Sequence, residues 1–363
     1  MSRKHLKLLE IEKSQMGSGS SQKIFTTVKS FSQRGKLLSR ADLQTLAESR
    51  DLDELVTRVK NTKYLDSVSS ITKPYTAEKI EAAMRMHLAD IQNSITKSSG
   101  GAKVLVAYFQ KFLITDLKLI LKGKVLGKSQ EEIESYVNLH AEELVKQRDV
   151  ILKALMAKDL DEAASNLGSL EFSADITKAI TLYNETKNIQ VFDAYFDKIL
   201  YQNISNAVRN SGDQDVSHIF GMDIDFYNIM SVLRGHFWDL EDTKIEDLLV
   251  TPTVTTPKHL LERMTAAENI ADALDELSST RYKDLIPESE DDAEMISKFE
   301  HSFEMATYKA VNGSFSKMFS FATTVAISKL IAYEIRNISA IAFAVEQKIP
   351  IETTMAKLII SED

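Results

Sequence analysis

The chain has 363 residues, of which 44% are hydrophobic and 27% charged, a balance typical of globular proteins large enough for two or three domains. It holds 12 Gly and 5 Pro, fewer turn-forming residues than a sheet-rich protein of this length needs, which favours a mostly helical fold. The absence of Cys excludes disulfides and thiolate metal sites, and the net charge of −9 argues against general binding of nucleic acid.

Charge is distributed unevenly along the chain. Residues 1–36 carry eight Lys or Arg against two acids, whereas residues 284–304 carry eight acids and one Lys. We expect residues 1–22, which contain GSGSS at 17–21, to form a flexible basic leader. No signal peptide is visible, and no apolar stretch reaches the roughly 18–20 residues that span a bilayer, so we expect no transmembrane segment.

A helical pattern appears early in the chain and recurs twice. The three stretches are DLDELVTRVKNTKY at 51–64, DLDEAASNLGSLEF at 159–172 and NIADALDELSSTRY at 269–282. In each, apolar residues fall at i, i+3, i+4 and i+7, one face of an α-helix. Each predicted helix follows Asp51, Asp159 or Asn269, whose side chains suit an N-cap because they accept bonds from free backbone N–H groups. Each stretch ends in an aromatic residue.

A second segment also occurs three times, and its copies begin at Asp116, Asn228 and Asn337. They read DLKLILKGKVLGKSQEEIESYV, NIMSVLRGHFWDLEDTKIEDLLV and NISAIAFAVEQKIPIETTMAKLI. We predict that the polar residue kept in every copy fixes helix packing through hydrogen bonds. Lys122 and Arg234 recur in two copies only, so we consider them either helix-end charges or parts of a positive rim that contacts a partner.

The two motifs keep a nearly constant separation of 65, 69 and 68 residues, which indicates three copies of one unit of about 110 residues. A unit of this size is a small multi-helix domain rather than a solenoid repeat of roughly 34–47 residues. We therefore predict an all-α fold of three similar domains, approximately 23–140, 141–252 and 253–363. Packed head to tail, they would close into a ring or grow into an open superhelix, and the chain ends could pack across repeats.

The stretch KGKVLGKS at 122–129 invites comparison with a phosphate-binding loop. A Walker A loop has four residues between its glycines, whereas Gly123 and Gly127 enclose three, and the preceding stretch has helical periodicity. We predict instead that Gly123 caps a helix and that Ser129 opens the next helix in a capping box. The alternative is a nucleotide-using enzyme that depends on Lys128.

The remaining candidates for chemistry are weak. The seven His show no H-x-x-x-H spacing, the acidic stretch ESEDDAE at 288–294 lacks the Gly of an EF-hand loop, and no G-x-S-x-G occurs. The sequence thus predicts a protein that is not an enzyme, with no catalytic residue, no cofactor, no metal site and no small-molecule substrate.

On these residues the chain resembles the C subunit of the archaeal-type (A/V-type) rotary ATP synthase, a family related to the d subunit of the vacuolar ATPase. The resemblance covers roughly residues 24–360 and rests on RGKLLSRADLQTLAESRDLDELVTRVKNTKY, TDLKLILKGKVLGKSQEEI, YNIMSVLRG and YEIRNISAIAFAVEQKIP. It implies three similar helical domains about a pseudo-threefold axis, which together form a funnel.

The resemblance also implies a role. Such a subunit is a non-catalytic adaptor, peripheral to the cytoplasmic face of the membrane, that links the central-stalk subunits to the membrane rotor ring. It transmits the torque that couples ion translocation to ATP synthesis or hydrolysis elsewhere in the complex. The alternative is a helical scaffold with the same fold in a different complex.

Overall fold

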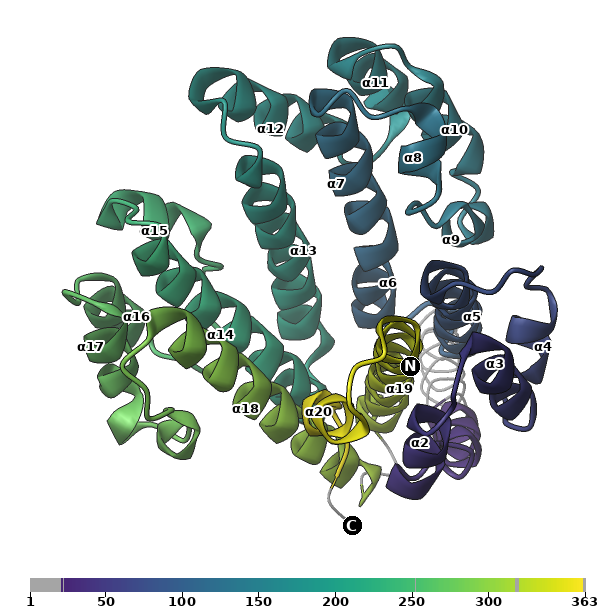
Figure 1. The fold of residues 1–363 in the computed structure, drawn as a ribbon. Coiled ribbons are helices and arrows are strands. Elements are labelled where there is room, and N and C mark those ends of the chain that lie inside the picture. The colour runs from purple at the N-terminus through teal and green to yellow at the C-terminus, as the bar shows by residue number, and fades with distance from the viewer. Residues whose placement is uncertain (1–20, 22, 252, 317–319, 362–363) are drawn as a thin grey trace, which may run out of the picture.

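The computed structural model describes residues 21, 23–251, 253–316 and 320–361. The described part is all-helical, as predicted, and contains no strand. The leader expected at 1–22 lies outside the described residues, apart from residue 21. Figure 1 shows long helices that approach one another near the middle of the molecule, with the shorter helices gathered toward the outside. None of the described helices is both long enough and apolar enough to cross a bilayer.

The long helices form the frame. They are α5 (Ala77–Ser98), α6 (Lys103–Phe109) and its continuation α7 (Lys111–Val125), α13 (Gln190–Ser211), α14 (Gln214–Phe237), α18 (Asp292–Gly313) and α19 (Ala322–Gln347). The shorter helices are α2 (Arg40–Ala47), α3 (Leu52–Lys60), α4 (Leu65–Ser69), α8 (Gln130–Glu134), α9 (Leu139–Leu144), α10 (Arg148–Met156), α11 (Leu160–Asn166), α12 (Ser173–Thr186), α15 (Asp242–Leu248), α16 (Lys258–Thr265), α17 (Ile270–Asp275) and α20 (Ile351–Lys357). Short 3-10 turns occur at η1 (Leu167–Ser169), η2 (Glu276–Ser279), η3 (Lys283–Leu285) and η4 (Ser314–Ser316).

Besides the contacts of α13 with α14 and of α18 with α19, which follow each other in the chain, the long helices pack in three pairs: α7 on α13, α14 on α18, and α19 on α5. Each pair joins a helix from one predicted repeat to a helix from another, so the packing crosses the boundaries expected between 23–140, 141–252 and 253–363. The helices predicted from the first motif follow the same rule, because α11 packs on α7, α17 on α14 and α3 on α19. The α19–α5 pair in particular joins the last part of the described chain to the first.

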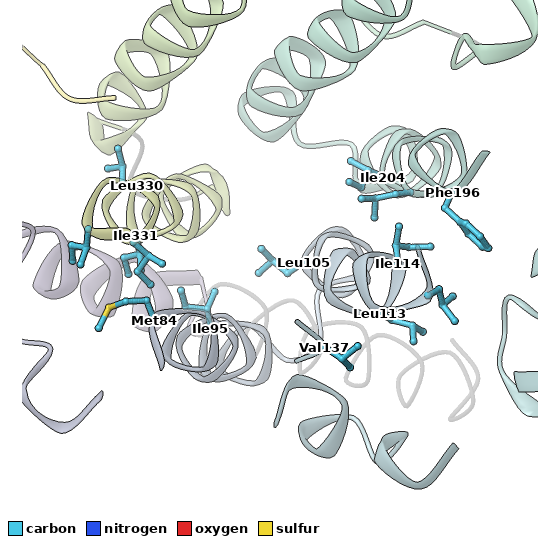
Figure 2. Packing of buried hydrophobic residues seen from close by; sticks show 14 of the residues in the cluster. Met84, Ile95, Leu105, Leu113, Ile114, Val137, Phe196, Ile204, Leu330 and Ile331 are labelled. Atoms are coloured by element: carbon cyan, nitrogen blue, oxygen red, sulfur yellow. The ribbon is translucent and has the colours of Figure 1, made fainter. Parts of the chain in front are cut away.

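Aliphatic and aromatic side chains fill the interfaces within these pairs. Figure 2 shows Ile331 of α19 directed toward Met84 and Ile95 of α5, and Ile114 of α7 directed toward Ile204 of α13. All five side chains are at least 95% buried. Burying a side chain of this size contributes roughly 1.5–3 kcal/mol, so these interfaces supply much of the stability of the frame.

A close contact between two helices explains why the chain has a glycine at position 123. Gly123 lies inside α7, which continues to Val125, so the prediction that Gly123 caps this helix is wrong. The residue that adopts the left-handed conformation after the helix is Gly127, with φ of 65°. A Cβ at Gly123 would lie 2.6 Å from the side chain of Ile133 on α8. Glycine is therefore needed at 123 for close packing rather than for a turn.

The second copy repeats this contact. A Cβ at Gly235 of α14 would lie 2.6 Å from the side chain of Ile245 on α15. In the third copy the corresponding residue is Ala344, as the aligned segments show. The predicted capping box downstream is confirmed, because Ser129 and Glu132 bond each other's backbone N–H groups at 3.2 and 2.9 Å.

Replacing Gly123 by Ala tests the close contact. Alanine favours the helix by about 1 kcal/mol, but overpacking against Ile133 costs about 1–3 kcal/mol, so we expect a net loss of unfolding free energy. Urea unfolding of the purified chain measures it. Gly313→Ala is the matched control, since a Cβ there meets no atom within 4 Å, and it should leave stability unchanged or raise it. Equal effects of the two substitutions would contradict the packing explanation.

Candidate functional site

The polar residues at the start of the second motif bond a segment 22 residues further along the chain. Asn228 accepts a hydrogen bond from the N–H of Val250 at 2.8 Å and donates its amide to the carbonyl of Val250 at 3.2 Å. Asn337 makes the same two bonds with Ile359, at 3.0 and 2.9 Å. Both amide side chains are buried, and each ties the segment that follows a short helix, α15 or α20, to the long helix that precedes it. We refer to positions 116, 228 and 337 as the clamp positions.

Asp116 occupies the clamp position of the first copy, where it accepts a bond from the N–H of Asn138 at 3.0 Å, again 22 residues on. The buried carboxyl group of Glu142 interacts with that of Asp116, and one oxygen of each group accepts no hydrogen bond from any described residue. Burial raises the pKa of Asp116 to about 7. Burial, together with the charge of Asp116, raises the pKa of Glu142 to about 8. The first copy therefore contains a buried titratable pair where the other copies have a neutral amide.

A second polar contact lies three residues before the clamp position in two copies. The hydroxyl of Tyr282 donates to Asp225 at 2.6 Å, and the hydroxyl of Tyr64 donates to Glu334. All four of these side chains are buried. In the remaining copy the corresponding residues are Phe172 and Leu113, both buried in the hydrophobic core. The donor and the acceptor have been replaced together, so neither is left buried without a partner.

The recurrence of an aromatic residue at 64, 172 and 282 is visible in the sequence, but its partner is not. The carboxylates Asp225 and Glu334 differ in side-chain length, and they lie 57 and 270 residues from the tyrosines that they bind. In the sequence, the carboxylate partner is marked only by its position, since Asp225 and Glu334 each stand three residues before an aligned asparagine.

The first-motif residues Asp51, Asp159 and Asn269 each cap the helix that follows. Their side chains accept the N–H of the residue three positions on at 2.8, 2.9 and 2.9 Å. The helices so capped are α3, α11 and α17, and each buries apolar side chains on its inner face, such as Leu55, Ala163 and Leu274. These contacts are local and solvent-accessible, and they involve no residue of another helix pair.

Lys122 and Arg234 both form ion pairs within the chain. Lys122 of α7 lies 2.5 Å from Asp193 of α13, and Arg234 of α14 lies 3.3 Å from Glu300 of α18. Each cation therefore links the two helices of one long-helix pair, α7 to α13 in the first case and α14 to α18 in the second. Their side chains remain 30% and 44% exposed, so both stay open to further contacts. The third copy has Phe343 at this position, and it is 53% exposed.

The stretch 122–129 has no phosphate-loop geometry in the structure, because its first half continues α7 and its end caps α8. The ammonium of Lys128 lies 2.9 Å from Glu132 within one exposed turn. Across the described residues, no group of three or more His, Asp or Glu side chains is arranged to hold a metal ion.

A cavity of about 310 Å³ lies among α6, α7, α13, α14, α18 and α19. The residue five places before each clamp position contributes to its lining in all three copies, as Lys111, Asp223 and Ala332. The three side chains differ in charge and size. The cavity is therefore built from corresponding positions of the copies, but its chemistry is not repeated.

Comparison with known proteins assigns the chain to a family. The sequence pattern of the family described as ATP synthase (C/AC39) subunit matches residues 27–357. The chain belongs to this family. It is similar to the C subunit of the A-type ATP synthase of Methanocaldococcus jannaschii, with 26% identity over 69% of this chain and 67% of the relative. It is also similar to the corresponding protein of Pyrococcus furiosus, with 25% identity over 86% of this chain and 84% of the relative.

Membership of this family confirms the resemblance seen in the sequence. It also indicates whether the chain is a catalytic subunit. The relatives are C subunits of an A-type ATP synthase, which are accessory chains rather than catalytic ones. The chain is accordingly an accessory subunit of such a complex and not an enzyme in its own right.

Asp116→Asn should change the dependence of stability on pH. A carboxyl group whose pKa is raised in the folded state loses unfolding free energy as pH rises from its unfolded pKa, about 3.9, to its folded value. The substitution removes this loss and restores the amide found at Asn228 and Asn337. We expect its stability relative to the unsubstituted chain to be greater at pH 8 than at pH 5, by about 2 kcal/mol.

Asn228→Asp is the matched control, because it introduces a carboxyl group at a clamp position that lacks one. It should lower the unfolding free energy measured in urea, and more so at pH 8 than at pH 5. If the stability change caused by Asp116→Asn is the same at both pH values, the carboxyl pair does not titrate as described.

Proposed function

We propose that the chain is the non-catalytic central-rotor adaptor of a rotary A/V-type ATP synthase or ATPase. In this role it links the central-stalk subunits to the membrane rotor ring, and it transmits the torque that couples ion translocation to ATP synthesis or hydrolysis. The observation that carries the proposal is the family match over residues 27–357. The proposal puts the chain at the cytoplasmic face of the membrane as a peripheral subunit.

The proposal includes three domains about a pseudo-threefold axis that together form a funnel. Three observations support that arrangement. The clamp bonds span 22 residues in every copy. The residues five places before the clamp positions all line one cavity. The α19–α5 pair supplies the third helix pair from opposite parts of the chain, which is the contact that a closed arrangement requires.

A torque-transmitting part has to resist bending, and two features of the chain favour this. Buried hydrogen bonds tie the segments that follow α15 and α20 to the long helices α14 and α19, and the interfaces between long helices are close-packed, with low compressibility. A body with threefold repetition also has to grip a ring whose symmetry need not match. Contact should therefore rest on many polar sites and on shape rather than on one specific lock.

Within this proposal Lys122 and Arg234 are contacts to a partner subunit. Both are partly exposed, and both sit at the same place on neighbouring helix pairs. Exposed ion pairs contribute only about 0–1 kcal/mol to stability, so removing these cations should leave the fold intact.

Binding of the purified chain to the purified central-stalk subunits tests the function. We expect a stable complex, and we expect the double variant Lys122→Gln with Arg234→Gln to bind roughly three- to tenfold more weakly at low salt. The control is Lys128→Gln with Lys258→Gln, which removes the same charge from two exposed ion pairs between residues four positions apart.

Failure of the unsubstituted chain to bind stalk subunits would overturn the adaptor role. Recovery of a different complex on affinity capture from cells would instead support the alternative, a helical scaffold in another assembly. Equal binding by the two double variants would exclude Lys122 and Arg234 as contacts without affecting the adaptor role.

A further inference from the structure

The cavity among the long helices contains a cation that nothing in the described chain neutralises. Five charged side chains line it, and both acids already have partners. Asp223 lies 2.6 Å from the ammonium of Lys329, and Glu304 accepts from both terminal nitrogens of Arg336. No described residue offers a hydrogen-bond acceptor to the ammonium of Lys111. The lining therefore has one positive charge in excess.

The surroundings of Lys111 make that excess charge costly. Its ammonium lies 4.1 Å from the ring centre of Tyr108 and 5.3 Å from that of Phe112, contacts that only partly replace water. Burial lowers the pKa of Lys111 to about 7, and the nearby charge of Lys329 contributes to this lowering. An anion within reach would offset both effects, because it would supply the opposite charge that the half-buried ammonium lacks.

Hydroxyl groups surround the same space. Tyr108, Tyr201 and Tyr333 line the cavity from α6, α13 and α19, and no described residue accepts a bond from any of their hydroxyls. Burial raises the pKa of all three phenols well above the ordinary value, so they remain protonated and able to donate. One ammonium and three O–H groups thus form a set of donors without acceptors.

We propose that this cavity binds a small oxyanion, a phosphate or carboxylate group, which Lys111 holds as an ion pair and the tyrosine hydroxyls hold through hydrogen bonds. A volume of about 310 Å³ accommodates a small ion with water, or the end of one acidic side chain, but not a helix. The two acidic side chains of the lining do not take the place of this anion, since Asp223 is already paired with Lys329 and Glu304 with Arg336.

The same chemistry has two sources, a free anion in solution or a carboxylate carried by a partner subunit, and two measurements separate them. The first is titration of the full chain with inorganic phosphate, followed by calorimetry and by NMR of 13C-labelled lysine side chains. The second is binding of the central-stalk subunits. Both are made on the unsubstituted chain and on Lys111→Met, which keeps the length of the side chain and removes its charge.

For a free anion we expect saturable phosphate binding, an upward shift of the Lys111 pKa in its NMR titration, and at least a tenfold loss of affinity in Lys111→Met. For a partner carboxylate we expect about tenfold weaker stalk binding by Lys111→Met. Lys111→Arg should keep most of the binding in either case, and Lys103→Met, from the exposed start of α6, is the control.

Unchanged phosphate binding and unchanged stalk binding in Lys111→Met would overturn the proposal. Phosphate binding that Lys103→Met weakens as much as Lys111→Met does would overturn it as well, since the ion would then sit elsewhere. If the stalk subunits do not bind the unsubstituted chain, the adaptor role fails, while the phosphate titration still decides whether the cavity is an anion site.

Discussion

The packing of α19 against α5 is the contact on which the rest of the structure depends. The two helices are about 220 residues apart in the chain, yet they form one of the three long-helix pairs. Two hydrogen bonds reinforce the contact, because the N–H of Ala77 donates to Glu346 at 3.0 Å and the side-chain amide of Gln92 donates to the carbonyl of Ser328 at 3.4 Å. Without α5, the buried face of α19 would lose the most extensive of its helix contacts.

The cavity follows from the same contact. Lys329 and Tyr333 belong to α19, and they line the cavity together with residues of α6, α13 and α14. Their positions are fixed because α19 is fixed against α5. The proposed anion site is thus a product of long-range packing rather than of any local motif.

Internal repetition made part of this molecule predictable. Apolar spacing and cap chemistry were enough to predict α3, α11 and α17, because a helix start depends on residues three or four positions apart. The polar clamp positions could be recognised as recurrent, but not their partners, since a bond across 22 residues leaves no periodic trace. Gly123 was misread for a related reason. A glycine after a basic residue suits a helix end, whereas the structure continues α7 past Gly123 and packs Ile133 against it.

The cavity could not have been predicted in this way. Lys111, Asp223 and Ala332 stand at one repeat position but share no chemistry, so alignment of the copies hides them rather than revealing them. The Tyr282–Asp225 contact and its apolar counterpart, Phe172 and Leu113, show the same limit. In this second case the pattern lies in a pair that changes together, and such a pair becomes visible only when the structure places its two members in contact.

The pairing of α19 with α5 also has a consequence for how the chain is made. At about 5–20 residues per second, α5 leaves the ribosome roughly 10–45 s before its partner has been synthesised. During that interval the side of α5 that faces α19, including Met84 and Ile95, lacks its partner, whereas only 64 residues separate α7 from α13. The contact between α5 and α19 can therefore form only when nearly the whole chain has been made, although α5 is one of the first helices to be synthesised.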